Sequence, residues 1–362
     1  MYIAQRALWA IPFDLDRLAT RGQPRLLPVP LVTDGYGSGQ FATAGELLAY
    51  VDAPGNAAGA SRSIVWIDWS GTATSVGDPG PYTQVRVSPD EKQTAVVGFE
   101  KGERDLRILD VQSQRFTRLR LDPVVVNGFP VWLPDSKRIA FQGHVTGETF
   151  SMWTITADGT GPPERLLMNN NAQLPTSASV DGYLVFHELW RQSETVDLGI
   201  MRMKLDPSRQ VKELVQTKAW EARGVVSPDG RWIAYECCTE AQPEIHVSPY
   251  PNTGGVRWPI SSGGGVLATW SSGSDQLFYA TRDGSLMRVA VDPRSSSWKA
   301  DAPRSVLPAG TLVGRERAPF DISHDGRRAL TLRAATEPGG SQPAKFVRFV
   351  QNWVEAFAPR AK

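Results

Sequence analysis

Histidine or glutamate stands at the ends of three apolar segments, where a metal ion or a general base could be assembled. His144 ends one apolar segment, His187 and Glu188 end the next, and Glu236 ends the one after that. Imidazole and carboxylate are ligands that divalent metals select, and a bound metal would activate water for hydrolysis. One hypothesis is therefore a divalent metal, Zn or Ca, held by His144, His187 and Glu188. Glu188 and Glu236 would be the catalytic carboxylates, one of them serving as general base.

A structural role for the same residues is the competing interpretation. No His-Glu-x-x-His or comparable metal motif accompanies them. His246, inside an apolar segment, and His324, in a polar turn, are expected to be structural. The adjacent Cys237 and Cys238 could bind a thiophilic metal or sense oxidants, but small apolar filling of a loop is the alternative.

A second set of polar residues could bind a ligand without catalysing a reaction. Most of them precede or begin an apolar segment, and Trp190 lies in a long loop between two such segments. The candidate ligand-binding residues are Gln84, Asn127, Gln173, Trp190, Arg223, Arg315 and Arg317. The arginines would attract carboxylates or phosphates. Pairing of these arginines with Glu221, Glu316 and Asp321 is the structural alternative.

The elements that position these residues come from a repeat. Its clearest copy is Val225–Tyr235, in which a Ser-Pro-Asp-Gly turn separates two apolar strands. Proline presets φ, aspartate bonds its own backbone, and glycine accepts the positive φ of a tight hairpin. Seven such turns recur at intervals of 44 to 52 residues, at Gly45, Glu91, Ser136, Gly182, Gly230, Ser274 and Gly326.

Two further strands follow each hairpin, so each unit has four short strands, as in a propeller blade. The sequence therefore predicts an all-β chain with one β-propeller over residues 1–353 and a tail over 354–362. Seven blades are expected, and eight are the alternative. Because residues 8–28 are similar to residues 286–308, we expect the N-terminal strands to complete the last blade, around Asp321–Arg333, and close the ring.

Composition excludes several classes of function. The chain has 39 basic and 38 acidic side chains and a net charge of +1, so no basic surface for nucleic acid is expected. Its two cysteines are adjacent, so no disulfide framework is implied. No signal peptide and no apolar run of membrane-spanning length is visible. The segment is expected to be cytoplasmic, although a longer parent protein could be attached to a membrane.

Residues 225–235 resemble the repeat of TolB-like, or WD-repeat-like, bacterial propellers. Leu8–Asp16, Pro249–Pro251, Trp258–Ser261 and Val350–Trp353 resemble the C-terminal propellers of bacterial serine/threonine kinases, and the likeness covers residues 1–353. The kinase motifs themselves are absent, so the resemblance does not imply kinase activity. It implies a sensor or docking module.

Two functions remain open from the sequence. The favoured one is a binding module of a bacterial signalling protein, which presents the top of its central channel to a peptide or small molecule. A kinase domain in a longer parent protein would be a further partner. The alternative is a metal-dependent hydrolase of the esterase or phosphotriesterase type, with its metal at the channel mouth.

Overall fold

A computed structural model of the chain describes residues 1–4, 7–14, 16–27, 29, 41–52, 61–100, 103–168, 171–192, 195–217, 219–239, 242–312, 320–335 and 346–356. The chain divides into two compact units. The larger comprises Ser61–Ala335, and the smaller comprises Met1–Ala60 together with Thr336–Lys362. The described part of the chain contains no helix that could span a membrane.

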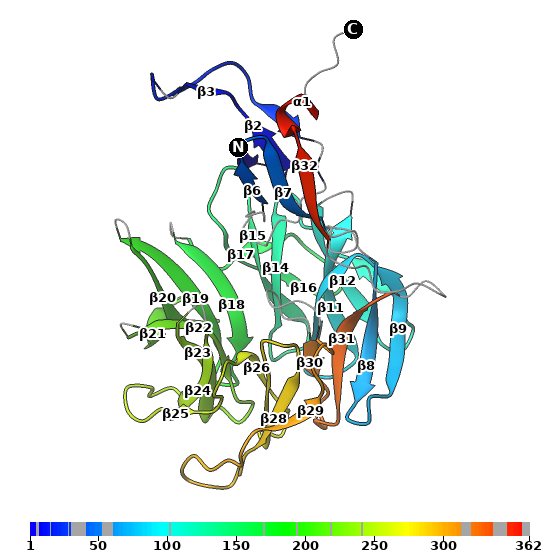
Figure 1. Cartoon of the computed structure of the whole chain (residues 1–362). Coiled ribbons are helices and arrows are strands. Elements are labelled where there is room, and N and C mark those ends of the chain that lie inside the picture. The colour runs from blue at the N-terminus through cyan, green and yellow to red at the C-terminus, as the bar shows by residue number, and fades with distance from the viewer. Residues whose placement is uncertain are drawn as a thin grey trace. The chain divides into compact units, whose positions relative to one another are not determined.

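The larger unit consists of antiparallel sheets of four strands each (Figure 1). In five of them the strands follow one another along the chain. These five sheets contain β10 (Tyr82–Val87), β11 (Gln93–Glu100), β12 (Glu103–Asp110) and β13 (Phe116–Arg118); β14 (Val125–Trp132), β15 (Arg138–His144), β16 (Ser151–Thr156) and β17 (Glu164–Arg165); β18 (Ala172–Ala178), β19 (Tyr183–Gln192), β20 (Thr195–Lys204) and β21 (Val211–Val215); β22 (Trp220–Val226), β23 (Trp232–Cys238), β24 (Glu244–Pro249) and β25 (Trp258–Pro259); and β26 (Val266–Trp270), β27 (Gln276–Ala280), β28 (Leu286–Ala290) and β29 (Arg304–Leu307).

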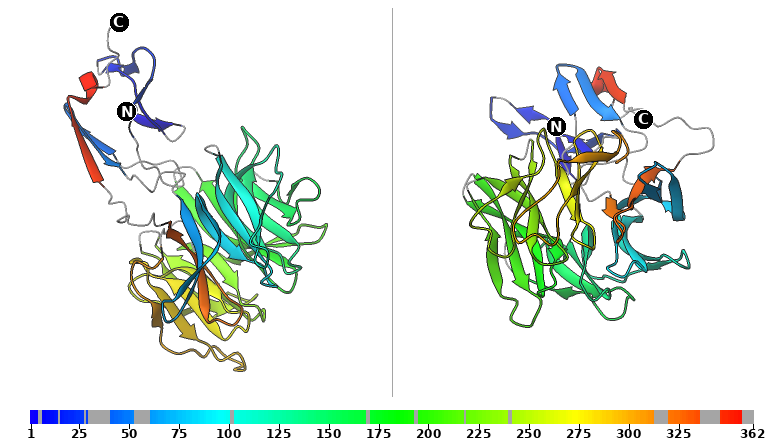
Figure 2. Two further views of the ribbon diagram at one scale, coloured as in Figure 1. Left: turned by 90° about the vertical axis from the view of Figure 1, so that its right-hand side faces the viewer. Right: turned by 90° about the horizontal axis from the view of Figure 1, so that it is seen from below.

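The sixth sheet joins the two ends of this unit. It contains, in spatial order, β30 (Phe320–Ile322), β31 (Arg328–Ala334), β8 (Arg62–Asp68) and β9 (Ala73–Gly80). The first strands of the sheets contact one another in the cyclic order β10, β14, β18, β22, β26, β30 and back to β10. The sheets are therefore arranged around a closed ring, which the views of Figure 2 show from two further directions. Closure leaves no first strand without a neighbour.

The predicted turn chemistry is present at the hairpins. In the turn of Ser227 and Asp229, the serine Oγ donates to the aspartate Oδ1 at 2.5 Å, and Gly230 has a φ of 70°. The same serine–aspartate bond recurs in the hairpins of Ser88 and Ser323, at 2.7 Å in each. The serine and aspartate side chains of the turn thus hydrogen-bond to each other. The glycine at the end of the turn adopts a positive φ, which other residues avoid.

The strands that close the ring differ from those predicted. β30 and β31 are the expected inner strands, but β31 pairs with β8 over seven register positions, whereas β2 (Ala7–Ala10) pairs with β1 (Tyr2–Ala4) and β5 (Arg25–Leu27). β8 is the longer partner, and four consecutive residues from Ile64 to Ile67 are buried in it. Seven blades, and the alternative of eight, are not confirmed, because the described part of this unit has six four-stranded sheets.

The smaller unit holds the strands at both ends of the chain. Besides β1, β2 and β5, it contains the hairpin of β3 (Phe13–Asp14) and β4 (Ala19–Thr20). A further sheet has the order β32 (Phe346–Gln351), β7 (Leu47–Asp52) and β6 (Phe41–Ala44), followed in sequence by α1 (Trp353–Ala356). Leu8, Leu27, Leu48 and Tyr50 form its buried core.

The core of the larger unit lies between neighbouring sheets. Phe141 of β15, for example, packs with Val97 of β11 in the preceding sheet. Two tryptophans also hydrogen-bond across such junctions. The indole Nε1 of Trp132 donates to the carbonyl of Arg86 at 3.0 Å, and that of Trp270 donates to the carbonyl of Val225 at 3.1 Å. Buried indoles usually need such an acceptor, and here the adjacent sheet supplies it.

Candidate functional site

Polar side chains gather in three consecutive sheets of the ring. The second strand of each sheet has one equivalent position, four residues after the carbonyl that closes the hairpin. Gln142, His187 and Glu236 occupy it in β15, β19 and β23, and all three are buried. In the other sheets the same position holds Val97, Ala280 and Leu332. We call eight polar side chains of β14, β15, β18, β19, β22 and β23 the polar sector: Asn127, Gln142, Gln173, His187, Glu188, Glu221, Arg223 and Glu236.

Glu236 bonds to two groups of different elements. Its Oε1 accepts a hydrogen bond from the backbone amide of Leu267 in β26, at 2.8 Å, and one from Arg223 Nη1, at 3.3 Å. The Glu236 side chain is 2% exposed and that of Arg223 is 23% exposed. The carboxylate is thus engaged by an amide and a guanidinium, and only the guanidinium reaches solvent.

His187 makes the equivalent contact one sheet earlier. Its Nδ1 accepts a hydrogen bond from the backbone amide of Arg223 in β22, at 3.4 Å. Burial lowers the pKa of His187 to about 3, and the charge of Arg223 acts in the same direction. The imidazole is therefore neutral near pH 7, and the nitrogen that accepts from Arg223 is not free to bind a metal.

The amides that His187 and Glu236 bind lie in equivalent bulges. Arg223 and Leu267 have φ values of 52° and 58°, and the register of β22 and of β26 shifts at these residues. Phe129 in β14 has a φ of 59°, and its amide donates to Gln84 Oε1 at 2.6 Å. A bulge removes an amide from the strand ladder. The side chain of the preceding sheet then supplies the missing acceptor.

Gln142, Gln173 and Glu188 form a chain of hydrogen bonds between two sheets. Gln142 Nε2 donates to the carbonyl of Gln173 at 2.5 Å, and Gln173 Nε2 donates to Glu188 Oε1 at 3.0 Å. At the other end, Asn127 Nδ2 donates to Gln142 Oε1. Gln173 Oε1 and Gln84 Nε2 are buried and have no hydrogen-bond partner among the described residues. Two buried polar atoms near this chain therefore retain unused bonding capacity.

The remaining predicted site residues are His144, Asn127, which makes a second contact, and three whose side chains lie outside the description. His144 packs edge-on against Phe150, with ring centroids 4.7 Å apart, and burial lowers its pKa. Asn127 Oδ1 accepts from Arg104 Nη1 at 2.6 Å. Arg315, Arg317 and the side chain of Trp190 lie outside the described residues.

The predicted metal ligands do not come together. Within the described residues, the group of histidine, cysteine and acidic side chains whose ligand atoms are close enough to share an ion is Cys237, Cys238 and His246. It contains none of His144, His187 and Glu188. The proposed metal site on those three residues, and the hydrolase hypothesis that depends on it, gain no support from this geometry.

Two members of these clusters, Gln142 and His246, are absent from the site residues that the sequence predicts. Gln142 precedes the end of its strand, but counting four residues from the carbonyl that closes each hairpin places it with His187 and Glu236. His246 is expected to be structural, although its register position in β24 opposite Tyr235 brings it near Cys237. Counting positions from the turns thus finds Gln142, whereas the strand register finds His246.

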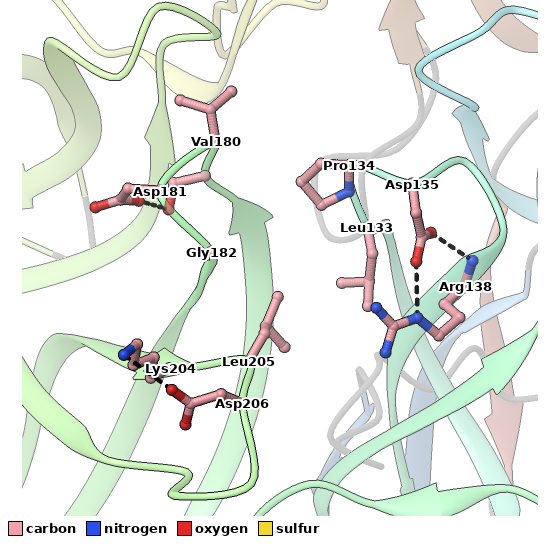
Figure 3. Close-up of a pocket in the computed structure, with 11 residues that line it drawn as sticks. Leu133, Pro134, Asp135, Arg138, Val180, Asp181, Gly182, Lys204, Leu205 and Asp206 are labelled. Carbon is pink, nitrogen blue, oxygen red and sulfur yellow. Dashed lines mark hydrogen bonds and ion pairs between the residues drawn. The ribbon is translucent and has the colours of Figure 1, made fainter.

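A shallow pocket of about 350 Å³ lies among the hairpins of two neighbouring sheets (Figure 3). One rim carries Asp135 and Arg138, which form an ion pair at 2.7 Å. The opposite rim carries Lys204 and Asp206, which pair at 2.9 Å. These charges are satisfied within their own rims, and no predicted site residue lines the pocket. Nothing in this arrangement selects a particular ligand.

Comparisons with known proteins identify the fold. No family model matches the chain, and no curated protein matches it. Among solved structures, putative TolB from Agrobacterium tumefaciens has a TM-score of 0.57 at 16% identity, over 77% of this chain and 99% of that one. TolB from Acinetobacter baumannii has a TM-score of 0.51 at 18% identity, over 71% and 68% of the two chains.

A puromycin-hydrolyzing peptidase from Mycobacterium tuberculosis has a TM-score of 0.50 at 14% identity, over 69% of this chain and 43% of that one. At these identities the likeness concerns the fold alone. The chain has the fold of a TolB-like β-propeller, as the repeat predicted. The resemblance to kinase-linked propellers is not confirmed by these comparisons and stays a prediction.

Proposed function

We propose that the larger unit is a binding module and that the polar sector is the part of the ring where it binds a peptide or a small molecule. The observation that carries this proposal is the one-sided distribution of polar side chains at one equivalent position of the second strands. Gln142, His187 and Glu236 occupy a position that Val97, Ala280 and Leu332 fill in the other sheets. The fold therefore closes without polar groups at this position, and their concentration on one side calls for another explanation.

Energetics supports the same proposal. Burying a polar side chain costs free energy unless its atoms are hydrogen-bonded, and an unpaired buried group costs about 1–3 kcal/mol. Gln173 Oε1 is such a group within the polar sector. A ligand with a hydrogen-bond donor would pair with this oxygen, and the partly exposed Arg223 would offer its guanidinium to a carboxylate or phosphate.

The finer proposal is that this module belongs to a bacterial signalling protein and that a kinase domain lies in a longer parent. Its support is the sequence resemblance of segments such as Leu8–Asp16 and Val350–Trp353. In such a protein the propeller would bind the signal while the attached domain responds to it. The binding proposal for the polar sector does not depend on this context.

The binding proposal can be tested with the chain itself. A library of small molecules and short peptides is screened for compounds that raise its melting temperature. Hydrogen exchange then maps each hit, and we expect protection in β18, β19, β22 and β23. Arg223→Gln should weaken binding about tenfold or more. Arg288→Gln, in β28 of a sheet with an aliphatic equivalent position, is the matched control and should leave affinity unchanged.

Hits that protect β26–β29 or β10–β13, and that bind Arg223→Gln as tightly as the unmodified chain, would contradict the proposal. In that case the polar sector would only stabilise the ring, through hydrogen bonds between neighbouring sheets.

A further inference from the structure

Cys237, Cys238 and His246 form a compact group at the end of β23. The two sulfur atoms and His246 Nε2 all lie within 4.8 Å of one another. Cys238 Sγ is 3.8 Å from His246 Nε2 and 2.7 Å from Cys237 Sγ. Two thiols and an imidazole are a ligand set that thiophilic metals select.

The backbone explains how neighbouring cysteines share one side of the sheet. Successive side chains of a strand normally point to opposite faces. Cys237 pairs with Glu244 and Tyr235 with His246, so Cys237 and His246 are diagonal neighbours on the same face. Cys238 would face the other way, but its φ of 91° departs from the extended conformation. This local departure brings the second thiol beside the first.

Cys237, Cys238 and His246 differ in burial, and the group is exposed to solvent on the Cys238 side. Cys237 is fully buried and His246 is 9% exposed, whereas Cys238 is exposed. Arg257 Nη1 lies 3.7 Å from Cys237 Sγ, where its charge favours an ionised sulfur. His246 Nδ1 is buried without a hydrogen-bond partner among the described residues. An ion could therefore approach from the Cys238 side.

We propose that Cys237, Cys238 and His246 bind a thiophilic d¹⁰ cation, for which Zn²⁺ is the representative. Tetrahedral Zn²⁺ places sulfur and nitrogen ligand atoms roughly 3.5 Å apart and two sulfurs roughly 3.8 Å apart. The Cys238–His246 distance is already close to this value. The exposed Cys238 thiol has to move outward by about 1 Å, and water would fill the fourth position.

Binding replaces protons with the metal ion. Burial raises the pKa of the Cys237 thiol to about 12, so this thiol is protonated before the ion arrives. Two metal–sulfur bonds form as two thiol protons leave to solvent, while neutral His246 donates its Nε2 lone pair. No oxidant or reductant is required. This inference is independent of the function proposed for the polar sector.

The test uses the whole chain, reduced and stripped of metal with a chelator. Co²⁺ is titrated as a spectroscopic probe, and Zn²⁺ is then added to displace it. We expect one Co²⁺ per chain, a thiolate-to-cobalt charge-transfer band, and release of close to two protons measured in weak buffer. Cys238→Ser, a change at an exposed residue, should reduce the band by half or more, because only the Cys237 thiolate remains, and weaken Zn²⁺ binding more than the roughly 10–100-fold typical of losing an outer-shell partner.

A second variant keeps the test independent of folding defects. His246→Asn should weaken Zn²⁺ binding to a similar extent, while His324→Asn, in a hairpin turn of another sheet, should bind as the unmodified chain does. Absence of a charge-transfer band, or unchanged binding by Cys238→Ser, would overturn the proposal. So would a chain that is isolated with a Cys237–Cys238 disulfide and binds no Zn²⁺ after reduction, because the pair would then serve thiol oxidation instead.

Discussion

The carboxylate of Glu236 accepts a hydrogen bond from the backbone amide of Leu267, which lies 2.8 Å away in the following sheet. Leu267 has a φ of 58°, a conformation that residues other than glycine seldom adopt. The register of β26 shifts at this residue, so its amide has no place in the strand ladder. Glu236 thus stabilises a strained position in a neighbouring sheet by providing the acceptor.

Removal of the Glu236 carboxylate should weaken this junction. Glu236→Leu leaves the amide of Leu267 unpaired and removes the ion pair of Arg223, so we expect it to cost about 3 kcal/mol of unfolding free energy. Glu236→Gln retains an oxygen for the amide and should cost about 1 kcal/mol. Urea unfolding measures both. Glu213→Leu, at an exposed position of β21, is the control, and equal small losses for all three variants would contradict the role of the carboxylate.

The sequence predicts the features of this fold that depend on residues close together in the chain better than those that depend on distant residues. The hairpin of Ser227, Asp229 and Gly230 is a local device, and its repetition correctly predicts the four-stranded sheets and the propeller fold. Ring closure is a competition between distant strands. Residues 8–28 carry the right pattern, yet β8 offers β31 a longer and more deeply buried partner, and sequence similarity does not measure that difference.

The roles of the candidate site residues stay predictions, but the structure shows bonds that several of them make. His187, Glu188 and Glu236 do lie in consecutive sheets, as their places at strand ends suggested. Their acceptor atoms, however, are engaged by the amides of Arg223 and Leu267 and by the side chain of Gln173. The amides of Arg223 and Leu267 need acceptors because β-bulges remove them from the strand ladder. Residue types alone do not predict where a bulge forms. Residue types at strand ends therefore do not show which acceptor atoms already bond within the ring.

The indole of Trp132 should contribute a measurable hydrogen bond between sheets. Trp132→Phe keeps an aromatic ring at the site but leaves the carbonyl of Arg86 without its 3.0 Å donor. We expect a loss of about 1–2 kcal/mol in unfolding free energy, and the same for Trp270→Phe, which removes the equivalent bond to Val225. Trp298→Phe is the comparison, since no indole hydrogen bond is described for this side chain. We expect a smaller loss of unfolding free energy for Trp298→Phe than for the other two variants, and a larger loss would contradict the role of the indole hydrogen bonds.

Gly128 tests how closely Gln84 is held against β14. A Cβ at Gly128 would lie 2.5 Å from Gln84 Nε2, and the φ of 122° is itself unfavourable for alanine. Gly128→Ala should therefore displace the Gln84 amide and break its bond to Phe129, at a cost of about 3 kcal/mol. Gly182→Ala has a φ of 83° with open space around the new Cβ, so it should cost only about 1 kcal/mol. Similar losses in thermal unfolding would show that Gln84 adapts.

His187 should make stability depend on pH in a defined window. Its pKa is about 3 in the folded chain, against about 6.5 when unfolded, so between these values the unfolded chain binds a proton that the folded chain does not. The free energy of unfolding therefore rises with pH across this window. His187 contributes fully above about pH 6.5, and its contribution falls by up to about 1.4 kcal/mol per pH unit as the solution is acidified towards pH 3.

His187→Gln separates this effect from the rest of the molecule. Glutamine occupies the equivalent position in the preceding sheet as Gln142, so the substitution suits the site and its oxygen can accept from the amide of Arg223. The variant should lose part of the pH dependence in urea unfolding between about pH 6.5 and pH 4. Some dependence will remain, because burial also lowers the pKa of His144 and His246. His324→Gln should retain the full slope, and a variant at His187 that also retains it would show that the buried imidazole becomes protonated without unfolding the chain.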